Sequence, residues 1–367
     1  MKKLQILAVI VAAITMFQFC SKNDTVVVTT VPEVAVTTLL PTLPATVFNY
    51  NVIFPAHIQA ALIANDNSPT NNPITNDGAT LGRVLFYDKQ LSKNNTISCA
   101  SCHKQEFSFD DNIAFSKGFL GGFTDRNSMT LLNLRFYKSG KMFWDERVNS
   151  VEQQALQPIQ NHVEMGLTLA ELQTKVTALS YYAPLFQKAF GSVQIDSVKI
   201  AKALSQFERS IVTYQAKYDR VKQGLENFTT AEAQGEAFFN STPPPPAGGG
   251  AAPVSCNACH TAPMFLNSVA TNTTPFALQD ALDAGINNQN KFKSSTLRNV
   301  STRTALFHNG RITNVQAMLT AGSPGSGTQP IPAHSVQPQD VQNLIAFMNT
   351  LTDIIIITDE KFSNPFK

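Results

Sequence analysis

The sequence predicts an all-α chain of two helical halves with long loops and little β structure. Three observations predict this fold class. A Cys-x-x-Cys-His motif occurs twice, and each half runs in the order helix, motif, loop, helix. No alternation of apolar and polar residues is long enough for a strand. The 367 residues are 43% hydrophobic and only 15% charged, which is enough for two sizeable cores. We therefore expect an N-terminal domain over 47–215 and a C-terminal domain over 216–367.

The two motifs carry the chemistry of the chain. They consist of Cys99, Cys102 and His103, and of Cys256, Cys259 and His260. In this pattern two thiols add across the vinyl groups of a haem, and the histidine that follows supplies an axial ligand to the iron. A four-thiolate zinc site would place its cysteine pairs closer together and needs no histidine. A redox dithiol would lie near a βαβ pattern, which is not found. The motifs predict two covalently bound haem c groups.

Residues 1–20 form a targeting segment rather than a fold element. Lys2 and Lys3 are basic, and the apolar run over 4–19 is short for a membrane span. Cys20 closes this run as the lipidated first residue of a bacterial lipoprotein would, although Phe19 is bulky for such a cleavage site. The alternative is an ordinary secretory signal with an incidental cysteine. Either leader places the mature chain outside the cytoplasm, in the periplasm, and the lipoprotein reading adds a lipid anchor on Cys20.

The mature chain begins with a tether rich in Thr, Val and Pro over 21–46. Helices are expected over 81–88, 151–156, 169–179, 198–214, 231–239 and 338–351. The helix over 198–214 has the clearest apolar period, and Pro338 suits the first turn of the last helix. The Pro- and Gly-rich run over 243–250 is predicted to be a surface insertion. The run of isoleucines over 354–357 fits a short strand or an extended segment.

Net charge limits the partners. A formal charge of +2 with no basic patch argues against a nucleic-acid partner. Membrane contact is expected only through the lipid anchor.

Several sequence blocks resemble the bacterial di-haem cytochrome c peroxidases and the related MauG-type enzymes. The blocks are Leu81–Asp88, Phe143–Asp145, Glu164–Gly166, Thr296–Val300 and His308–Gly310. The resemblance covers residue 81 to the C-terminus. It implies two cytochrome-c-like domains with one haem each. The N-terminal haem would meet hydrogen peroxide, and the C-terminal haem would receive electrons from a small donor, a cytochrome c or a copper protein. A homodimer is one assembly that such a chain can form.

The same resemblance assigns residues near the N-terminal haem. Cleavage of the peroxide O–O bond needs a group that takes a proton from one oxygen and returns it to the other, which a carboxylate can do. Glu164 matches the family's distal glutamate, and Gln154 matches its glutamine partner. Taken from the residues alone, these two could equally be an exposed pair on a helix. Trp144 matches the tryptophan that the family places between the haems as a route for electrons. As the single Trp of the chain, it also suits a core position.

Asn127 matches a family residue that helps to hold a calcium ion between the domains. Backbone carbonyls and water would supply the other ligands. An asparagine that caps a loop is the alternative.

The chain departs from the family at the N-terminal haem. Many members carry a second axial histidine sixteen residues after the first, and here that place is Phe119, which cannot bind iron. His162 lies two residues from Glu164 and could approach the same pocket, or it could be an exposed turn residue.

A second departure concerns the C-terminal haem. The family's sixth ligand, a Met or in MauG-like members a Tyr, is expected fourteen residues after His308, where this chain has Gly322. Met318 lies one helical turn earlier and could substitute, or it could be a core methionine. His308 itself is expected to be a structural or propionate-side residue.

Three functions remain open from the sequence. The first is a cytochrome c peroxidase. The second is a MauG-like oxidase that modifies a partner protein. The third is a non-catalytic electron-transfer protein, against which Glu164 and Phe119 argue. The peroxidase is the prediction, because no Tyr stands at the ligand position of the C-terminal haem.

Overall fold

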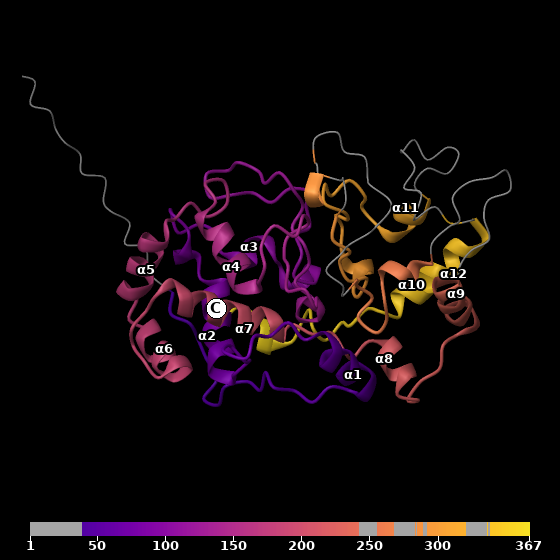
Figure 1. Cartoon of the computed structure of the whole chain (residues 1–367), viewed down its shortest axis with the longest axis horizontal. Coiled ribbons are helices and arrows are strands. Elements are labelled where there is room, and N and C mark those ends of the chain that lie inside the picture. The colour runs from indigo at the N-terminus through magenta and orange to yellow at the C-terminus, as the bar shows by residue number, and fades with distance from the viewer. Residues whose placement is uncertain are drawn as a thin grey trace, which may run out of the picture. The chain divides into compact units, whose positions relative to one another are not determined.

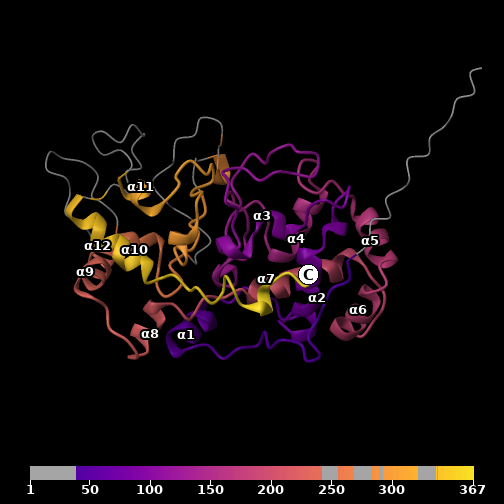
Figure 2. The ribbon, with the colours of Figure 1, turned by 180° about the vertical axis from the view of Figure 1, so that it is seen from behind.

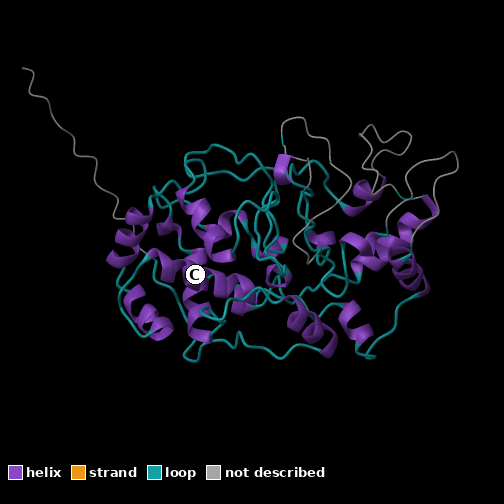
Figure 3. Cartoon of the chain, viewed as in Figure 1, coloured by secondary structure: helices purple, strands orange, loops and turns teal. Residues whose placement is uncertain are grey.

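The computed structural model describes residues 39–241, 255–267, 283, 285–288, 292–320, 336 and 338–367. The chain from Leu39 to Lys367 forms one compact unit. All regular elements of the described residues are helical, and the only β pairings there are isolated bridges (Figure 3). This confirms the all-α fold class.

The helices follow one another along the whole described chain. The α-helices are α1 Ala56–Asn65, α2 Asn76–Tyr87, α3 Cys99–Cys102, α4 Val151–Gln160, α5 Leu169–Ala178, α6 Tyr182–Phe190, α7 Ser197–Ser210, α8 Lys217–Lys222, α9 Thr230–Asn240, α10 Cys256–Cys259, α11 Val315–Thr320 and α12 Pro338–Asn349. Short 3-10 turns are η1 Lys89–Leu91, η2 Gln105–Phe107, η3 Leu134–Phe136, η4 Ile286–Asn288, η5 Val300–Thr302 and η6 Glu360–Phe362.

Each helix expected from the sequence is present, with shifted ends. α2 begins five residues before 81, because the Thr75 hydroxyl accepts a hydrogen bond from the amide of Gly78 and caps the helix there. α4 continues through Pro158 to Gln160, and α7 ends at Ser210 rather than at 214. Besides the single-turn helices of the two motifs, α3 and α10, four described helices were not expected: α1, α6, α8 and α11. The isoleucine run over 354–357 forms a turn, not a strand.

α1 shows why such a helix escapes a search for apolar period. Ile58 and Leu62 are buried one turn apart, but Ile63 is 79% exposed. Apolar residues therefore lie on both faces of the helix, and the amphipathic signal cancels.

The N-terminal core is built on the crossing of α2 and α7. A Cβ on Gly82 would lie 2.0 Å from the carbonyl oxygen of Ala203, so the two backbones are in direct contact there. The C-terminal core repeats this arrangement with α9 and α12. A Cβ on Gly235 would lie 2.0 Å from the carbonyl oxygen of Asn343. Each half thus contains a pair of helices that cross in the same way. Figure 1 shows the helices of both pairs side by side.

Each half contributes a segment that packs against the other half. The last residues pack in the N-terminal core, where Ile356 and Phe362 are buried. The Tyr87 hydroxyl donates to the carbonyl oxygen of Phe362 at 2.7 Å. In the other direction, α1 lies beside α8 of the C-terminal half (Figures 1 and 2), and His57 on α1 contacts Asp219 on α8.

Some predictions fall outside the described residues. They are the leader over 1–20 with Cys20, most of the tether over 21–46, the insertion over 243–250, and Gly322. Among the described residues, none of the helices is long and apolar enough to cross a membrane.

Candidate active site

Each Cys-x-x-Cys-His motif folds as a single helical turn. In α3 the amide of His103 donates to the carbonyl oxygen of Cys99 at 2.9 Å, and in α10 the amide of His260 donates to that of Cys256 at 2.9 Å. All four motif cysteines are free thiols rather than disulfides. Burial raises the pKa of each thiol, to about 11 for Cys102 and Cys256, so the thiols are protonated at neutral pH.

Both motif histidines are oriented by a backbone carbonyl. Nδ1 of His103 lies 3.1 Å from the carbonyl oxygen of Phe109, and Nδ1 of His260 lies 3.3 Å from that of Phe265. A carbonyl can only accept, so Nδ1 carries the proton and Nε2 is the unprotonated nitrogen that a metal ligand requires. Burial also lowers the pKa of His103, which keeps its imidazole neutral.

The loops behind the two histidines have the same construction. The Thr130 hydroxyl donates to the carbonyl oxygen of Ser108 at 2.6 Å, and the Thr296 hydroxyl donates to that of Met264 at 2.5 Å. Each threonine opens a Thr-Leu-x-Asn segment that ends in a left-handed asparagine, Asn133 or Asn299. The internal repeat therefore extends from the helix crossing to the loops that position the ligands.

His103 opens onto a cavity of ≈ 920 Å³. Gln154, Glu164 and Trp144 line the same cavity. The structure thus brings together the residues that the sequence assigned to peroxide chemistry. Glu164 is half-buried, and burial raises the pKa of its carboxyl group, while the positive charge of Arg147 opposes the rise. Arg147 also lines the cavity and was not identified from the sequence.

Gln154 is held in place through its helix. On α4, Glu152 accepts two hydrogen bonds from Arg209 of α7, at 2.7 and 3.0 Å. Arg209 is 1% exposed, and its charge lowers the pKa of Glu152 to about 2 even though burial acts the other way. This buried ion pair fixes α4, and with it Gln154, on the N-terminal core.

Phe119 turns away from the cavity. Its amide donates to the carbonyl oxygen of Glu164 at 3.0 Å, and its ring lies 2.6 Å from where a Cβ on Gly166 would sit. Phe119 does not line the cavity, although Phe115 and Phe123 of the same loop do. His162 is exposed and also lines the cavity. The sequence allowed it to be either an exposed turn residue or a residue near the pocket, and its position has features of both.

A second, narrower cavity lies at the C-terminal motif. Cys256, Cys259 and His260 line it together with Met318, which is 4% exposed. Met348 of α12 lines it too. The sequence had placed Met348 only in the apolar stripe of that helix. A buried thioether directed at a cavity cannot be told from a core methionine by spacing alone.

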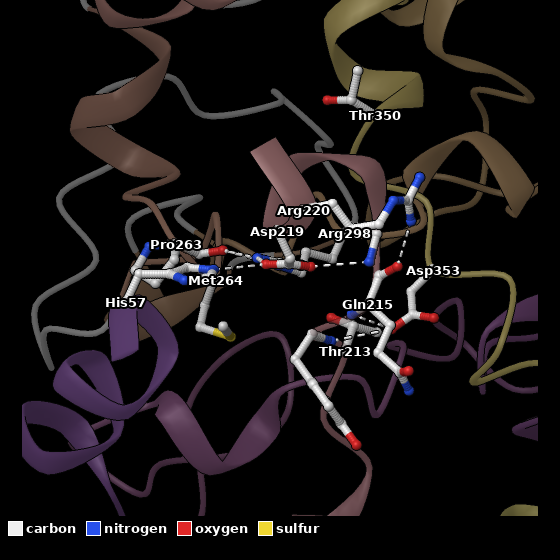
Figure 4. Close-up of polar contacts among 12 residues, drawn as sticks. His57, Thr213, Gln215, Asp219, Arg220, Pro263, Met264, Arg298, Thr350 and Asp353 are labelled. Carbon is white, nitrogen blue, oxygen red and sulfur yellow. Dashed lines mark hydrogen bonds and ion pairs between the residues drawn. The ribbon is translucent and has the colours of Figure 1, made fainter. Parts of the chain in front are cut away.

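A buried charged network fixes the loop behind His260 (Figure 4). Arg298 donates two hydrogen bonds to Asp219, at 2.7 and 2.8 Å, and both residues are inaccessible to solvent. Arg298 also donates to the carbonyl oxygen of Pro263, two residues before the carbonyl that orients His260. His57 contacts the other side of Asp219 at 3.0 Å. The network ties α1, α8 and the ligand loop together.

Asn127 lies between the two cavities and lines both. Its side-chain amide contacts the carbonyl oxygens of Ile113 and Ala114, each at 3.1 Å. The predicted calcium site is not tested by this geometry. Within the described ranges, no group of three or more His, Cys, Asp or Glu side chains is arranged to hold a metal ion.

The donors present at both motifs fit haem c. Each site offers two neutral thiols on one turn and an imidazole whose unprotonated nitrogen is Nε2. The C-terminal cavity is lined largely by apolar side chains, and the N-terminal cavity by polar and apolar side chains together. His103 and His260 would hold the two irons, and the four cysteines would form the covalent links.

Comparisons with known proteins agree with this reading. The family model described as "Di-haem cytochrome c peroxidase" matches residues 76–227. The chain is 30% identical over 291 residues to "Cytochrome c551 peroxidase" of Nitrosomonas europaea, covering 76% of this chain and 81% of that one. It is 29% identical over 300 residues to "Methylamine utilization protein MauG" of Methylorubrum extorquens, covering 77% and 80%.

A solved structure is also similar over nearly the whole chain. It is described as a "MauG-like protein associated with microbial copper homeostasis", with a TM-score of 0.71 and 26% identity, covering 87% of this chain and 100% of that one. The chain therefore belongs to the di-haem cytochrome c peroxidase family.

Proposed function

We propose that the protein reduces hydrogen peroxide to water, with electrons that a small redox protein delivers at the C-terminal haem site. The observation that carries the proposal is the meeting of Glu164, Gln154 and His103 on one cavity. The overall reaction consumes one peroxide, two electrons and two protons and yields two molecules of water. When bound, haem c supplies an iron that accepts and donates single electrons.

The residues around the cavity supply the proton chemistry. The carboxylate of Glu164 accepts the proton of one peroxide oxygen and returns it to the oxygen that leaves as water. Its raised pKa suits this exchange, because a group that must both take and give a proton works best when its pKa is near the working pH. Gln154 offers an amide donor and an acceptor in the same space, and we assign it the orientation of the peroxide.

Two further assignments complete the proposal. Trp144 lines both cavities, which supports a role in the electron route between the sites. Met318 is proposed as the sixth ligand of the C-terminal iron. From the apolar leader that ends at Cys20, we also propose a periplasmic lipoprotein, and from Asn127 a calcium ion between the domains.

A MauG-like oxidase of a partner protein is the second candidate. The similarity to a MauG-like structure favours it. The tyrosines of this chain weigh against it. Tyr218 is the last tyrosine of the sequence, and it lies in the C-terminal core rather than in the wall of the second cavity. The tyrosine ligand expected of MauG-like members therefore has no counterpart here.

The test is peroxide reduction with reduced cytochrome c as donor, for wild type, Glu164→Gln and Glu226→Gln. Glu226 is a partly exposed residue of the C-terminal half that pairs with Arg220, outside both cavities. Loss of a positioned acid–base group costs about 10²- to 10⁴-fold in turnover, so Glu164→Gln should lose that much while keeping both haems. Glu226→Gln should match wild type. Turnover of Glu164→Gln near wild type would remove this residue from the mechanism.

A further inference from the structure

Trp144 and His308 occupy equivalent turns in the two halves. The amide of Met142 donates to the carbonyl oxygen of Val148, and the amide of Leu306 donates to that of Ile312. Each turn therefore spans seven residues. In both, a left-handed phenylalanine comes second, Phe143 at φ +69° and Phe307 at φ +68°. The next residue is Trp144 in the first turn and His308 in the second. The repeat thus assigns His308 as the counterpart of Trp144.

The two turns are joined by a matched pair of backbone hydrogen bonds between the halves. The amide of Asn127 donates to the carbonyl oxygen of His308 at 2.7 Å, and the amide of Lys293 donates to that of Trp144 at 2.8 Å. Asn127 and Lys293 each stand three residues before the threonine of a Thr-Leu-x-Asn segment. Each half thus holds the ring-bearing turn of the other by the same contact.

The two rings meet at this junction. The Trp144 and His308 ring centroids are 6.4 Å apart, with an angle of 73° between the planes, which is an edge-to-face contact. The indole N–H of Trp144 donates to the carbonyl oxygen of Asn127 at 2.8 Å and fixes its ring. His308 is stacked on Phe292, with centroids 3.7 Å apart and planes 4° apart. His308 is 2% exposed, so packing fixes both rings.

Both rings line both cavities. Phe292 lines only the C-terminal cavity. A chain of aromatic contacts therefore runs from the C-terminal cavity through Phe292, His308 and Trp144 to the N-terminal cavity. Each ring in this chain contacts the next one directly.

We propose that His308 is a second relay residue for electrons between the haem sites, in series with Trp144. This rests on the proposed function, in which electrons enter at the C-terminal site and are used at the N-terminal one. Each passage moves one electron from the C-terminal haem site to the N-terminal haem site. Two passages, with two protons, complete the reduction of one peroxide. His308 undergoes no net change, because the electron that arrives on its side leaves through Trp144.

The proposal predicts that the electron-transfer rate depends on the ring at position 308. His308→Leu removes the π system at similar bulk, and His308→Phe keeps a ring that can stack on Phe292. Phe228→Leu is the matched control, because Phe228 packs in the C-terminal core against Tyr218 and Phe347 and lines neither cavity.

The experiment uses the di-haem protein without peroxide. A laser pulse injects one electron into the oxidised protein, and absorbance follows its redistribution between the haems, with both midpoint potentials measured separately. We expect the redistribution to slow by about tenfold or more in His308→Leu, as it should in Trp144→Leu, with both potentials unchanged. His308→Phe and Phe228→Leu should keep a rate close to wild type. A wild-type rate in His308→Leu would overturn the proposal, as would a slow rate in His308→Phe with unchanged potentials.

A fallback variant and the absence of peroxide keep the result interpretable. If His308→Leu loses haem or fold, the double replacement of Trp144 and His308 by phenylalanine decides instead, and a rate much slower than wild type would then overturn the proposal. Because no peroxide is present, the outcome does not depend on whether the protein turns over peroxide. Failure of the relay proposal and failure of the peroxidase proposal can therefore be told apart. The first would change the electron-transfer result, and the second would change only the peroxide assay.

Discussion

At the scale of single residues, the chemistry depends on how Glu164 is placed. Its carboxylate stands half-buried in the wall of the cavity that His103 faces. Burial disfavours the charged form, and Arg147 is the charge that favours it. In the proposed mechanism, the protonation of this side chain therefore controls whether the cavity can accept the proton of peroxide.

This gives a pH prediction for Arg147→Gln. A protonated Glu164 cannot accept a proton, so the rate of reaction with peroxide should fall in acid, through a pKa above the ordinary glutamate value. Removing the Arg147 charge makes the carboxylate less favourable, so that pKa rises further and the acid limb moves to higher pH. The shift should be small, since Arg147 is about half exposed and its charge is screened.

Stopped-flow rates over a pH series check this shift. Arg220→Gln is the control, because Arg220 is equally exposed and pairs with Glu226 in the other half. Its acid limb should match that of wild type. An unmoved or lowered acid limb in Arg147→Gln would show that Glu164 does not set the limb.

The sixth ligand of the C-terminal iron is a second prediction at this scale. Met318 and Met348 both line that cavity, and replacement of either by leucine conserves volume. If Met318 is the ligand, Met318→Leu should abolish the charge-transfer absorption of methionine-bound ferric haem, and Met348→Leu should keep it. The reverse pattern would assign Met348 instead.

Sequence reading was most successful for residues whose chemistry is carried by a motif. The two attachment motifs could be found because their spacing is local, and Glu164 was assigned through the family resemblance of the block around it. His308 could not be recognised as the counterpart of Trp144, since the two turns share only a phenylalanine and an arginine in sequence, Phe143 and Arg147 against Phe307 and Arg311. Their equivalence lies in hydrogen bonds between residues far apart in the chain, and a single sequence does not show such contacts.

At the scale of elements, the structure depends on two helix crossings. The α2–α7 and α9–α12 pairs both approach at a glycine, Gly82 or Gly235, against a backbone carbonyl. Each crossing supports one core, and the motif turns α3 and α10 pack beside them. The sequence predicted these four helices, and an apolar stripe indicated two of them, α7 and α12. It did not predict their close approach, since a glycine within a helix only weakens the helical signal.

Gly82→Ala and Gly235→Ala should each destabilise the protein. The added methyl would lie 2.0 Å from a carbonyl oxygen in a neighbouring helix, so two backbones must separate. Overpacking of this kind costs about 1–3 kcal/mol or more in the free energy of unfolding. Urea unfolding followed by circular dichroism measures the loss.

Gly122→Ala provides the comparison for these two variants. A Cβ at Gly122 would lie 3.6 Å from a methyl group of Val163, which is ordinary contact. Its unfolding midpoint should stay close to wild type. Equal midpoints for all three variants would mean that the helices do not cross as closely as the structure shows.

At the scale of the whole molecule, the two halves are tied together at several places. The C-terminal residues pack in the N-terminal core, α1 reaches the Asp219–Arg298 pair behind His260, and the ring turns exchange hydrogen bonds at the junction. These contacts join residues as many as 311 positions apart, as between Tyr50 and Lys361. No local pattern indicates such pairings, so the sequence could predict two halves but not how they are joined.

The loop that carries Phe119 determines whether peroxide can reach the N-terminal site without a prior activation step. In family members with a second axial histidine, the peroxide site must be freed before it reacts. Here the equivalent residue is Phe119, whose ring lies on Gly166 and outside the cavity wall. The central claim is therefore that the N-terminal site is open to peroxide in the fully oxidised protein. His162 lines the same cavity close to Glu164 and is a candidate for the side chain that closes it.

The most direct test is an EPR spectrum of the oxidised di-haem protein, recorded before and after rapid mixing with peroxide. We predict a high-spin ferric signal from the N-terminal haem that peroxide consumes without prior reduction, in wild type and in His162→Ala alike. Two low-spin signals, with no reaction until an electron is added, would contradict the claim. Recovery of the high-spin signal in His162→Ala would then identify this histidine as the group that closes the site.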